Sequence, residues 1–263
     1  MSHIVCILRA CAPPNIDALL EGFCKNAPAF VDVDVYEGVL PYRVRAASIY
    51  IGHVAPYWGA ELARQTEAAV IGMAPGFADF LNSIDRESGR SVMFVFMGGE
   101  EYFNMSMTDY QPPCDFYMPW HSTLPILPKR QVIPLHAIEK HVEFCLKKSI
   151  DNFTAIRALN PDMQIFNVIC PPPLPKEFLH KVDGIPNSVQ ENSFRLKCYH
   201  LYVKTLTEAT SRLNIKSLMP PPIAIDNNGM AKPEYMNDNI HGNTLFGKEV
   251  LAQINELLQT RCG

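Results

Sequence analysis

The stretch SVMFVFMGG, Ser91 to Gly99, decides the fold that the sequence predicts. It is a near-continuous run of apolar residues, rich in β-branched and aromatic side chains, and it ends in two glycines. A strand that is apolar on both faces is typical of a parallel sheet covered by helices on both sides. Because other short apolar runs alternate with longer segments of helical period, the sequence predicts an α/β fold with a mostly parallel sheet.

The remaining elements follow from the same periodicity. We expect further strands in HIVCILRA, VDVDVYEG, ASIYIG, EAAVIGM, MQIFNVIC and IKSLM, which cover residues 3–10, 31–38, 47–52, 67–73, 163–170 and 215–219. Helices are expected at residues 15–24, 56–65, 137–159, 193–213 and 246–258, the second of them with Pro56 in its first turn. The last two strands each run into three prolines, which mark strand exits because proline cannot donate to a ladder.

Size and composition limit the classes of protein that the chain can belong to. A length of 263 residues with 48% hydrophobic and 19% charged residues is typical of one globular domain spanning residues 1–263. A formal net charge of -4 gives no electrostatic case for a nucleic-acid partner. No apolar run approaches the roughly 20 residues that span a bilayer, and no leader pattern opens the chain, so we expect a cytoplasmic protein without a membrane partner.

The eight cysteines are scattered and form no Cys-x-x-Cys pair. Buried free thiols are therefore expected in place of disulfides or a zinc site, and no cofactor is predicted. Residues 111–134 are rich in proline and aromatic residues and contain no regular pattern. Long loops of this kind are usually functional, so this segment is predicted to form a lid or loop.

Chemically suggestive residues follow several predicted strands. Gly52 and His53 come at the end of one strand, Gly99-Glu100-Glu101 follows the strand at residue 91, and Asp238 and His241 come after the last strand and a loop. Because ligands bind at the carboxyl ends of strands in open parallel sheets, these residues are expected to form a single site for a small molecule.

Asp238 and His241 are spaced as a base and its orienting partner can be. The carboxylate can accept a hydrogen bond from the imidazole, fix its tautomer and stabilise the imidazolium that forms on proton abstraction. A loop histidine held by a nearby aspartate without a chemical role has the same spacing, so this pattern alone leaves both interpretations open.

Several longer stretches resemble the SGNH/GDSL hydrolase superfamily, in a divergent bacterial branch. They are PPCDFYMPWHSTLPILPKRQVIP, VICPPP, LKCYHLYVK and MPPPIAIDNNGMAKPEYMNDNIHGNTLFG, and the resemblance extends from Ala47 to the C-terminus. It implies a three-layer α/β/α domain with a flavodoxin-like sheet, to which residues 1–45 would add an N-terminal β-α-β segment. It also implies a serine nucleophile after the first family strand, and a glycine and an asparagine that bind the oxyanion.

Carried onto this sequence, the resemblance makes His241 the general base and Asp238 its partner. It places the nucleophile turn at residues 51–54 and the oxyanion turn at Gly99-Glu100-Glu101. The sequence departs from the family at both turns: IYIGHVAPYWG holds no serine, and a glutamate stands in place of the amide donor. An ionised carboxylate cannot donate a hydrogen bond to an oxyanion.

Two further residues could fill these positions. Asn104 could supply the missing amide if the turn is displaced, although an exposed loop asparagine has the same pattern. Cys11 follows the first strand ahead of a helix, which is a position that can lower the pKa of a thiol, although an ordinary buried cysteine is the alternative.

Three hypotheses on function therefore remain open. The first is an SGNH-like hydrolase or acyltransferase that acts on a small-molecule acyl ester through Asp238 and His241. The second is a catalytically degenerate protein that keeps the fold and binds a ligand or partner. The third is a metal-dependent or glutamate-based enzyme in which His53, Glu100, Glu101 and His241 take part. The oligomeric state has no signature in the sequence.

Overall fold

The structure is a computed structural model, and it describes residues 4–9, 33–34, 40–44, 49–54, 63–65, 71–73, 92–96, 100–108, 110, 112–179 and 190–262. The helix expected at residues 15–24, Cys11 and Gly99 lie outside these ranges. Among the described helices, none combines the length and the apolar character needed to cross a bilayer.

A seven-stranded sheet in the order β11-β10-β7-β1-β4-β3-β2 forms the centre of the molecule. Five of these strands pair with one another in parallel. They are β1 (Ile4–Arg9), β4 (Ile49–Val54), β7 (Val92–Phe96), β10 (Gln164–Val168) and β11 (Lys216–Leu218). At one edge β3 (Leu40–Val44) and β2 (Val33–Asp34) continue the sheet in antiparallel pairing. The parallel strands therefore present their carboxyl ends at one rim.

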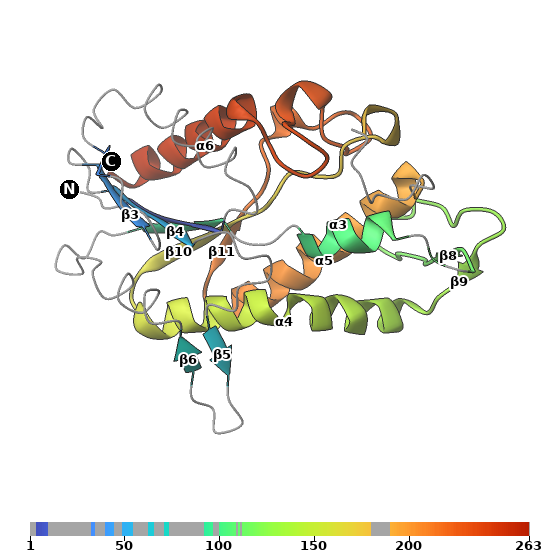
Figure 1. Ribbon diagram of the computed structural model, residues 1–263, viewed down its shortest axis with the longest axis horizontal. Helices are drawn as coiled ribbons and strands as arrows, with labels where there is room; N and C mark the ends of the chain where they lie inside the picture. The colour runs from blue at the N-terminus through green and yellow to red at the C-terminus, as the bar shows by residue number, and fades with distance from the viewer. Residues whose placement is uncertain are drawn as a thin grey trace.

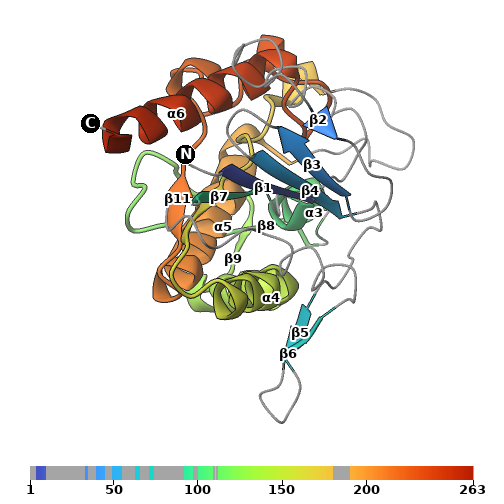
Figure 2. The ribbon, with the colours of Figure 1, turned by 90° about the vertical axis from the view of Figure 1, so that its left-hand side faces the viewer.

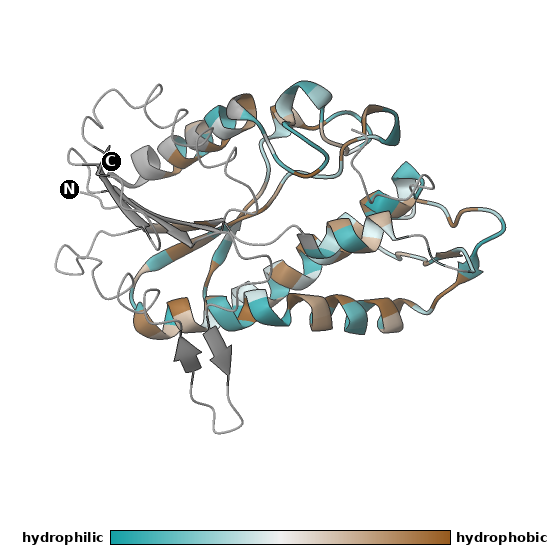
Figure 3. Cartoon of the chain, in the orientation of Figure 1, coloured by the Kyte–Doolittle hydropathy of each residue, from teal (hydrophilic) through white to brown (hydrophobic). Residues whose placement is uncertain are grey.

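Helices cover both faces of this sheet (Figures 1 and 2). Helix α6 (Thr244–Cys262) lies on one face, and α3 (Glu100–Met107), α4 (Leu135–Leu159) and α5 (Asn192–Arg212) lie on the other. Polar and apolar residues alternate along α4 as its amphipathic pattern requires (Figure 3). The predicted α/β fold with a mostly parallel sheet in three layers is confirmed.

Strand β7 is apolar because it is buried on both faces. Met93 and Val95 belong to the core under α4 and α5, and Phe94 on the opposite face stacks on Phe166 of β10 with the ring centroids 5.1 Å apart. None of the three β7 side chains is exposed. Burying a side chain of this size contributes about 1.5–3 kcal/mol, which explains why the sequence signal is strongest here.

The N-terminal strands enter the sheet in an order that the local pattern does not reveal. Strand β1 lies between β4 and β7, in the middle of the parallel set, so this part of the predicted N-terminal addition belongs to the central sheet. Strand β3 was not predicted, because LPYRV combines a proline and an arginine with few apolar residues. Its pairing with β4 stabilises it as an extended segment.

The helix predicted at residues 56–65 is wrong over its last three residues. Ala63–Gln65 forms strand β5, which pairs antiparallel with β6 (Ile71–Met73) in a separate hairpin beside α4. The run EAAVIGM therefore contributes a hairpin strand outside the main sheet. Pairing between the two strands and packing against a neighbouring helix outweigh the intrinsic helix preference of the Ala-Arg-Gln sequence.

The predicted lid at residues 111–134 contains only two short strands, β8 (Cys114–Asp115) and β9 (Gln131–Val132), which pair in parallel. A buried ion pair joins this segment to α5. Lys197 Nζ lies 2.9 Å from each carboxylate oxygen of Asp115 and 2.8 Å from the carbonyl oxygen of Pro125, and neither Lys197 nor Asp115 has an exposed side chain. The Asp115 carboxylate also accepts hydrogen bonds from the backbone N–H groups of Phe116 and Leu127.

Two stacked histidines form a second contact between this segment and α5. The rings of His121 and His200 have centroids 4.0 Å apart, and Lys204, one turn further along α5, lies over the ring of Trp120. Burial, together with the charge of His121, lowers the pKa of His200 to about 4. A charged His200 is therefore disfavoured while the segment is docked.

This contact predicts a loss of stability on acidification. An unfolded His200 has the ordinary pKa of about 6.5 and binds more protons than the folded one between that pH and about pH 4. The stabilisation is therefore complete above about pH 6.5 and is lost as the pH falls toward 4. After allowance for the partial exposure of the ring, we expect His200 to account for about 1–2 kcal/mol of this loss.

Urea unfolding at pH 7 and pH 4.5 measures the effect. The His200→Gln variant should lose about 1 kcal/mol less stability between these two pH values than the unmodified protein. Carboxylates that titrate in the same range cancel in the comparison. Equal losses in the two proteins would contradict the assignment.

Candidate active site

The loop between β11 and α6 is folded by its own hydrogen bonds. It contains the short 3-10 helices η2 (Pro222–Ala224) and η3 (Pro233–Tyr235), and an antiparallel bridge between Met236 and Gly242 closes a tight turn. Asn243 then begins α6, because its side-chain oxygen accepts the N–H groups of Leu245 and Phe246. The turn from Met236 to Gly242 is thus held at both ends, and it contains Asp238 and His241.

Asp238 and His241 are in direct contact within this turn. His241 Nδ1 lies 2.6 Å from Asp238 Oδ2, while Asp238 Oδ1 accepts the backbone N–H groups of Ile240 and His241, each at 2.8 Å. Because the carboxylate is fixed by two backbone donors, it holds the imidazole in one orientation. An ionised Asp238 requires a proton on Nδ1, which leaves the lone pair of His241 on Nε2.

The surroundings favour this protonation state. Burial raises the pKa of Asp238, but the hydrogen bonds from the His241 ring and from the two backbone N–H groups outweigh that effect and leave the pKa below its ordinary value. The side chains of His241 and Asp238 are 16% and 36% exposed. His241 Nε2 is buried and has no hydrogen-bond partner among the residues that the structure describes. A basic nitrogen is therefore held in a fixed position with its lone pair unused.

Gly242 allows the turn to lie close to α6. A Cβ atom at this position would be 2.5 Å from Cδ1 and 2.8 Å from Cβ of Phe246, whose side chain is buried. The clash involves the Cβ of Phe246 and cannot be relieved by rotating the ring alone. A side chain at residue 242 would therefore push His241 away from the first turn of α6.

The predicted oxyanion turn leads directly into helix α3. Glu100 and Glu101 are its first two residues, where carboxylates interact favourably with the partial positive charge of a helix N-terminus. Glu101 accepts a hydrogen bond from Ser149 of α4 at 2.9 Å, so part of its carboxylate serves the packing of the helix layer. Asn104 is exposed, one turn further along α3. The carboxylate of Glu101 thus has a structural role at the start of a helix.

Tyr102 joins α3 to the exit of β10. Burial is the main cause that raises the pKa of Tyr102, and the charges of Cys170 and Asp238 raise it further, while Arg195 opposes them. The Tyr102 hydroxyl donates to the carbonyl oxygen of Pro171, at the proline-rich exit of β10. The start of α3 and the exit of β10 are therefore in direct contact.

The other predicted site residues are placed only by their backbone. Gly52 and His53 occupy the carboxyl end of β4, where His53 is in register with Leu8 of β1, and their side chains are outside the described ones. Gly99 lies outside the described residues. Among the side chains that the structure does describe, no three His, Cys, Asp or Glu residues are grouped as metal ligands. The hypothesis of a metal held by His53 and Glu100 stays a prediction.

Sequence reasoning missed the buried polar residues that surround this end of the sheet. Tyr199 donates to the carbonyl oxygen of Cys170, and Arg195 donates to that of Leu174, so both fix the segment that leaves β10. These partners are 21 or more residues apart in the chain. A charged residue flanked by Phe194 and Leu196 in a largely apolar helix was the only signal that could have found Arg195.

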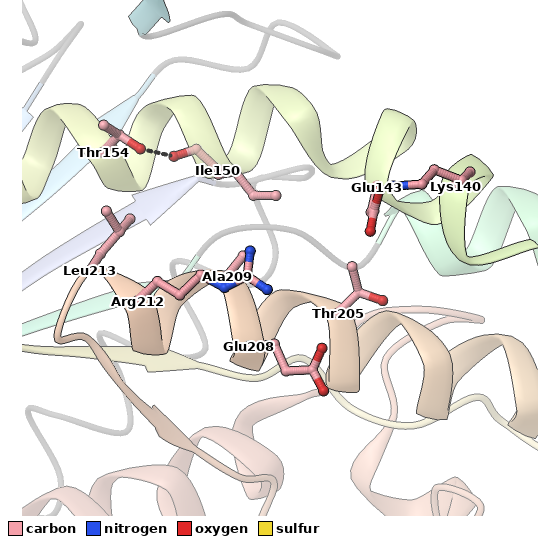
Figure 4. A pocket seen from close by; sticks show the side chains of 9 residues that line it. All are labelled: Lys140, Glu143, Ile150, Thr154, Thr205, Glu208, Ala209, Arg212 and Leu213. Carbon is pink, nitrogen blue, oxygen red and sulfur yellow. Dashed lines mark hydrogen bonds and ion pairs between the residues drawn. The ribbon is translucent and has the colours of Figure 1, made fainter. Parts of the chain in front are cut away.

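A separate open hollow of about 470 Å³ lies between α4 and α5 (Figure 4). Its lining is polar and apolar in about equal parts and consists of Lys140, Glu143, Ile150, Thr154, Thr205, Glu208, Ala209, Arg212 and Leu213. Neither Asp238 nor His241 contributes to it. The hollow is therefore a feature of the helix layer, distinct from the candidate site.

Comparisons with known proteins find similarity at the level of structure only. No protein-family model matches the sequence, and no curated relative matches it. A GDSL-like lipase from Bacteroides thetaiotaomicron is similar at 8% identity and a TM-score of 0.46, over 98% of this chain and 88% of the other. Phospholipase A1 from Streptomyces albidoflavus is similar at 10% identity and a TM-score of 0.45, over 96% and 98%.

The periplasmic domain of a lipopolysaccharide acetyltransferase from Salmonella ser. Paratyphi A is similar at 8% identity and a TM-score of 0.46, over 97% of this chain and 83% of that domain. The first of the three structures is described as GDSL-like, the superfamily that the sequence resembles. Because each TM-score is below 0.5, the assignment of the α/β/α fold rests on the strand order and the helix layers described above.

Proposed function

We propose that the protein is an SGNH-like ester hydrolase or acyltransferase that acts on a small-molecule acyl ester, with His241 as general base. The observation that carries this proposal is the Asp238–His241 pair, joined at 2.6 Å, in which the opposite ring nitrogen of His241 is buried and bonds to no described residue. Asp238 orients the ring and stabilises the imidazolium that forms when Nε2 takes a proton from the nucleophile. A histidine held only for stability has no need of an unpaired buried nitrogen.

The strand order supports a site at the carboxyl ends of β1 and β7. The chain continues from β1 to β4 on one side and later to β7 and β10 on the other, so the direction of winding changes between β1 and β7. Ligands bind in the crevice at such a switch point in open α/β sheets. Glu100 begins α3 just beyond β7, and the Tyr102 hydroxyl joins this helix to the exit of β10.

This topology favours a different nucleophile turn from the one at residues 51–54. The resemblance implies a nucleophile after the first family strand, and the first strand of this parallel sheet is β1. Cys11 follows its last residue, Arg9, by two positions, and it is the only Ser, Thr or Cys between residues 10 and 23. We therefore assign the nucleophile to Cys11, which lies outside the described residues.

The described cysteines do not compete for this role. Burial raises the pKa of each of the four free thiols at Cys114, Cys145, Cys170 and Cys198, which disfavours the reactive thiolate. Cys170 and Cys198 are affected most.

The proposed reaction proceeds in two steps. His241 accepts the thiol proton as the Cys11 sulfur attacks the ester carbonyl, and the backbone N–H groups at the start of α3 stabilise the oxyanion. The tetrahedral adduct expels the alcohol, which takes the proton from His241 and leaves a thioester on Cys11. Water or an acceptor hydroxyl then loses its proton to His241, attacks the thioester and releases the acid or the new ester together with the free thiol.

Selective labelling tests the pairing of Cys11 with His241. At pH 7, iodoacetamide should modify Cys11 about tenfold faster in the unmodified protein than in the His241→Ala variant, because the imidazole withdraws the thiol proton. Peptide mass spectrometry locates the label, and Cys198, which has no exposed surface, serves as an internal buried control. Equal labelling rates at Cys11 in the two proteins would remove it from the mechanism.

A further inference from the structure

Arg157, Lys197 and Arg195 are three basic residues whose side chains make different sets of hydrogen bonds with the rest of the protein. Arg157 donates to five backbone carbonyl oxygens, those of Leu213, Asn160, Pro161, Met163 and Asn214. Lys197 directs hydrogen bonds to both oxygens of Asp115 and to Pro125. Both side chains are satisfied by the protein itself and have structural roles.

Arg195 differs from them although it lies on α5 only two residues before Lys197. Its Nη1 donates to the carbonyl oxygen of Leu174 at 2.5 Å and makes a long contact of 3.5 Å with Asn192 Oδ1. Its Nε and Nη2 are buried and have no hydrogen-bond partner among the described residues, and Arg195 has no exposed surface. No ion pair to Arg195 is present among the residues that the structure describes.

This arrangement leaves one complete edge of the guanidinium unused. Nε and Nη2 together form the edge that binds a carboxylate or another oxoanion through two parallel N–H···O bonds. Burial lowers the pKa of Arg195, as expected for a cation held in an apolar environment. An arginine remains protonated in proteins, and a buried charge without a partner costs free energy that a bound anion would recover.

The unused edge lies in the neighbourhood of the candidate active site. Leu174, whose carbonyl oxygen holds Arg195, packs with Ala231 and Met236 in one small apolar cluster, and Met236 starts the turn that contains Asp238 and His241. The next residue of α5, Leu196, lies 3.5 Å from the position that a Cβ of Gly229 would take. The α5 start and the loop before α6 are therefore in direct contact.

We infer that Arg195 binds an oxoanion, a carboxylate or a phosphate, on the substrate of the neighbouring site, so that the preferred acyl esters are anionic. The inference rests on the proposed function for its link to ester chemistry, whereas binding of the anion depends only on Arg195. Arg195 is a residue that sets specificity, and His241 performs the proton transfer. Removal of the guanidinium should therefore raise KM for anionic esters by a larger factor than KM for neutral esters.

Calorimetric titration with succinate and with inorganic phosphate, at constant ionic strength set by sodium chloride, tests the binding. The full-length protein should bind one of these anions saturably, and Arg195→Met should bind it at least about thirtyfold more weakly. Arg195→Lys keeps the charge but loses the two-pronged edge and should fall between them. Arg212→Met, in the α4–α5 hollow on the same helix, is the matched control and should bind as the unmodified protein does.

The outcomes separate this inference from the proposed function. Absence of saturable binding to the unmodified protein overturns the inference, whether or not Arg195→Met folds. Unchanged binding in a folded Arg195→Met variant, or loss of binding in Arg212→Met, also overturns it. If the unmodified protein binds the anion through Arg195 yet hydrolyses neither 4-nitrophenyl acetate nor 4-nitrophenyl hemisuccinate, the inference stands and the proposed function fails.

Discussion

Replacement of His241 by alanine is expected to lower kcat/KM for an acyl ester by about 10²–10⁴-fold, because it removes the group that takes the proton from the nucleophile. Asp238→Asn should have an effect of similar size: the amide keeps the shape of the carboxylate but no longer fixes the proton on His241 Nδ1. A panel of 4-nitrophenyl esters of increasing acyl length, followed by release of nitrophenolate, measures both changes.

Asp226→Asn provides the matched control for this experiment. Asp226 lies in the same loop and its Oδ1 likewise accepts two backbone N–H groups, those of Asn228 and Met230, but it has no histidine partner. We expect its activity to stay within about twofold of the unmodified protein. Equal activity in His241→Ala and the unmodified protein would contradict the role of His241. A ligand that stabilises the protein without any turnover would favour the hypothesis of a binding protein.

The Lys197→Met variant is expected to lose about 3–5 kcal/mol of unfolding free energy. Methionine is similar in length to lysine, but it leaves the Asp115 carboxylate buried without its cation. The carbonyl oxygen of Pro125 also loses its hydrogen-bond donor. Because this pair holds the proline-rich segment to α5, the segment should also become sensitive to proteolysis in the variant. Urea unfolding followed by circular dichroism gives the free-energy difference.

Two further variants test the cause of that loss. Lys147→Met removes an ion pair with Asp151 in which the lysine is 61% exposed, and it should cost at most about 0.5–1 kcal/mol. The double variant Lys197→Met/Asp115→Leu removes both buried charges and should recover part of the stability, because an apolar pair can replace a buried ion pair. A single Lys197→Met variant within about 1 kcal/mol of the unmodified protein would show that the pair is not a major contributor.

The fold was predictable where burial leaves a pattern along a single segment. Strand β7 was recognised because Met93, Phe94 and Val95 are all buried, and no polar residue interrupts the run. The central position of β1 was not predictable, because the order of strands depends on pairing between segments more than 40 residues apart. Strand β5 was missed for a different reason: its three residues favour a helix in isolation, and only their pairing with the nearby strand β6 makes them extended.

The candidate site likewise contains residues that could be predicted from one segment of sequence and residues that could not. Asp238 and His241 could be paired from the sequence because they lie within one turn, and three residues of spacing suffice for their contact. The role of Arg195 and the pairing of Lys197 with Asp115 could not be predicted from the sequence. Lys197 and Asp115 are 82 residues apart, and their contact depends on how the proline-rich segment folds over α5. Glu101, one of the two glutamates that looked out of place in an oxyanion turn, has a structural role at the start of the helix that begins there.

The central claim is that His241 activates a nucleophile at the end of β1, and intact-protein mass spectrometry tests it most directly. After mixing with 4-nitrophenyl acetate, the unmodified protein should gain the mass of one acetyl group within the first turnover, and peptide mapping should place that group on Cys11. The His241→Ala variant should remain unmodified over the same time. Acetylation of both proteins at the same rate, or at a residue other than Cys11, would contradict the account.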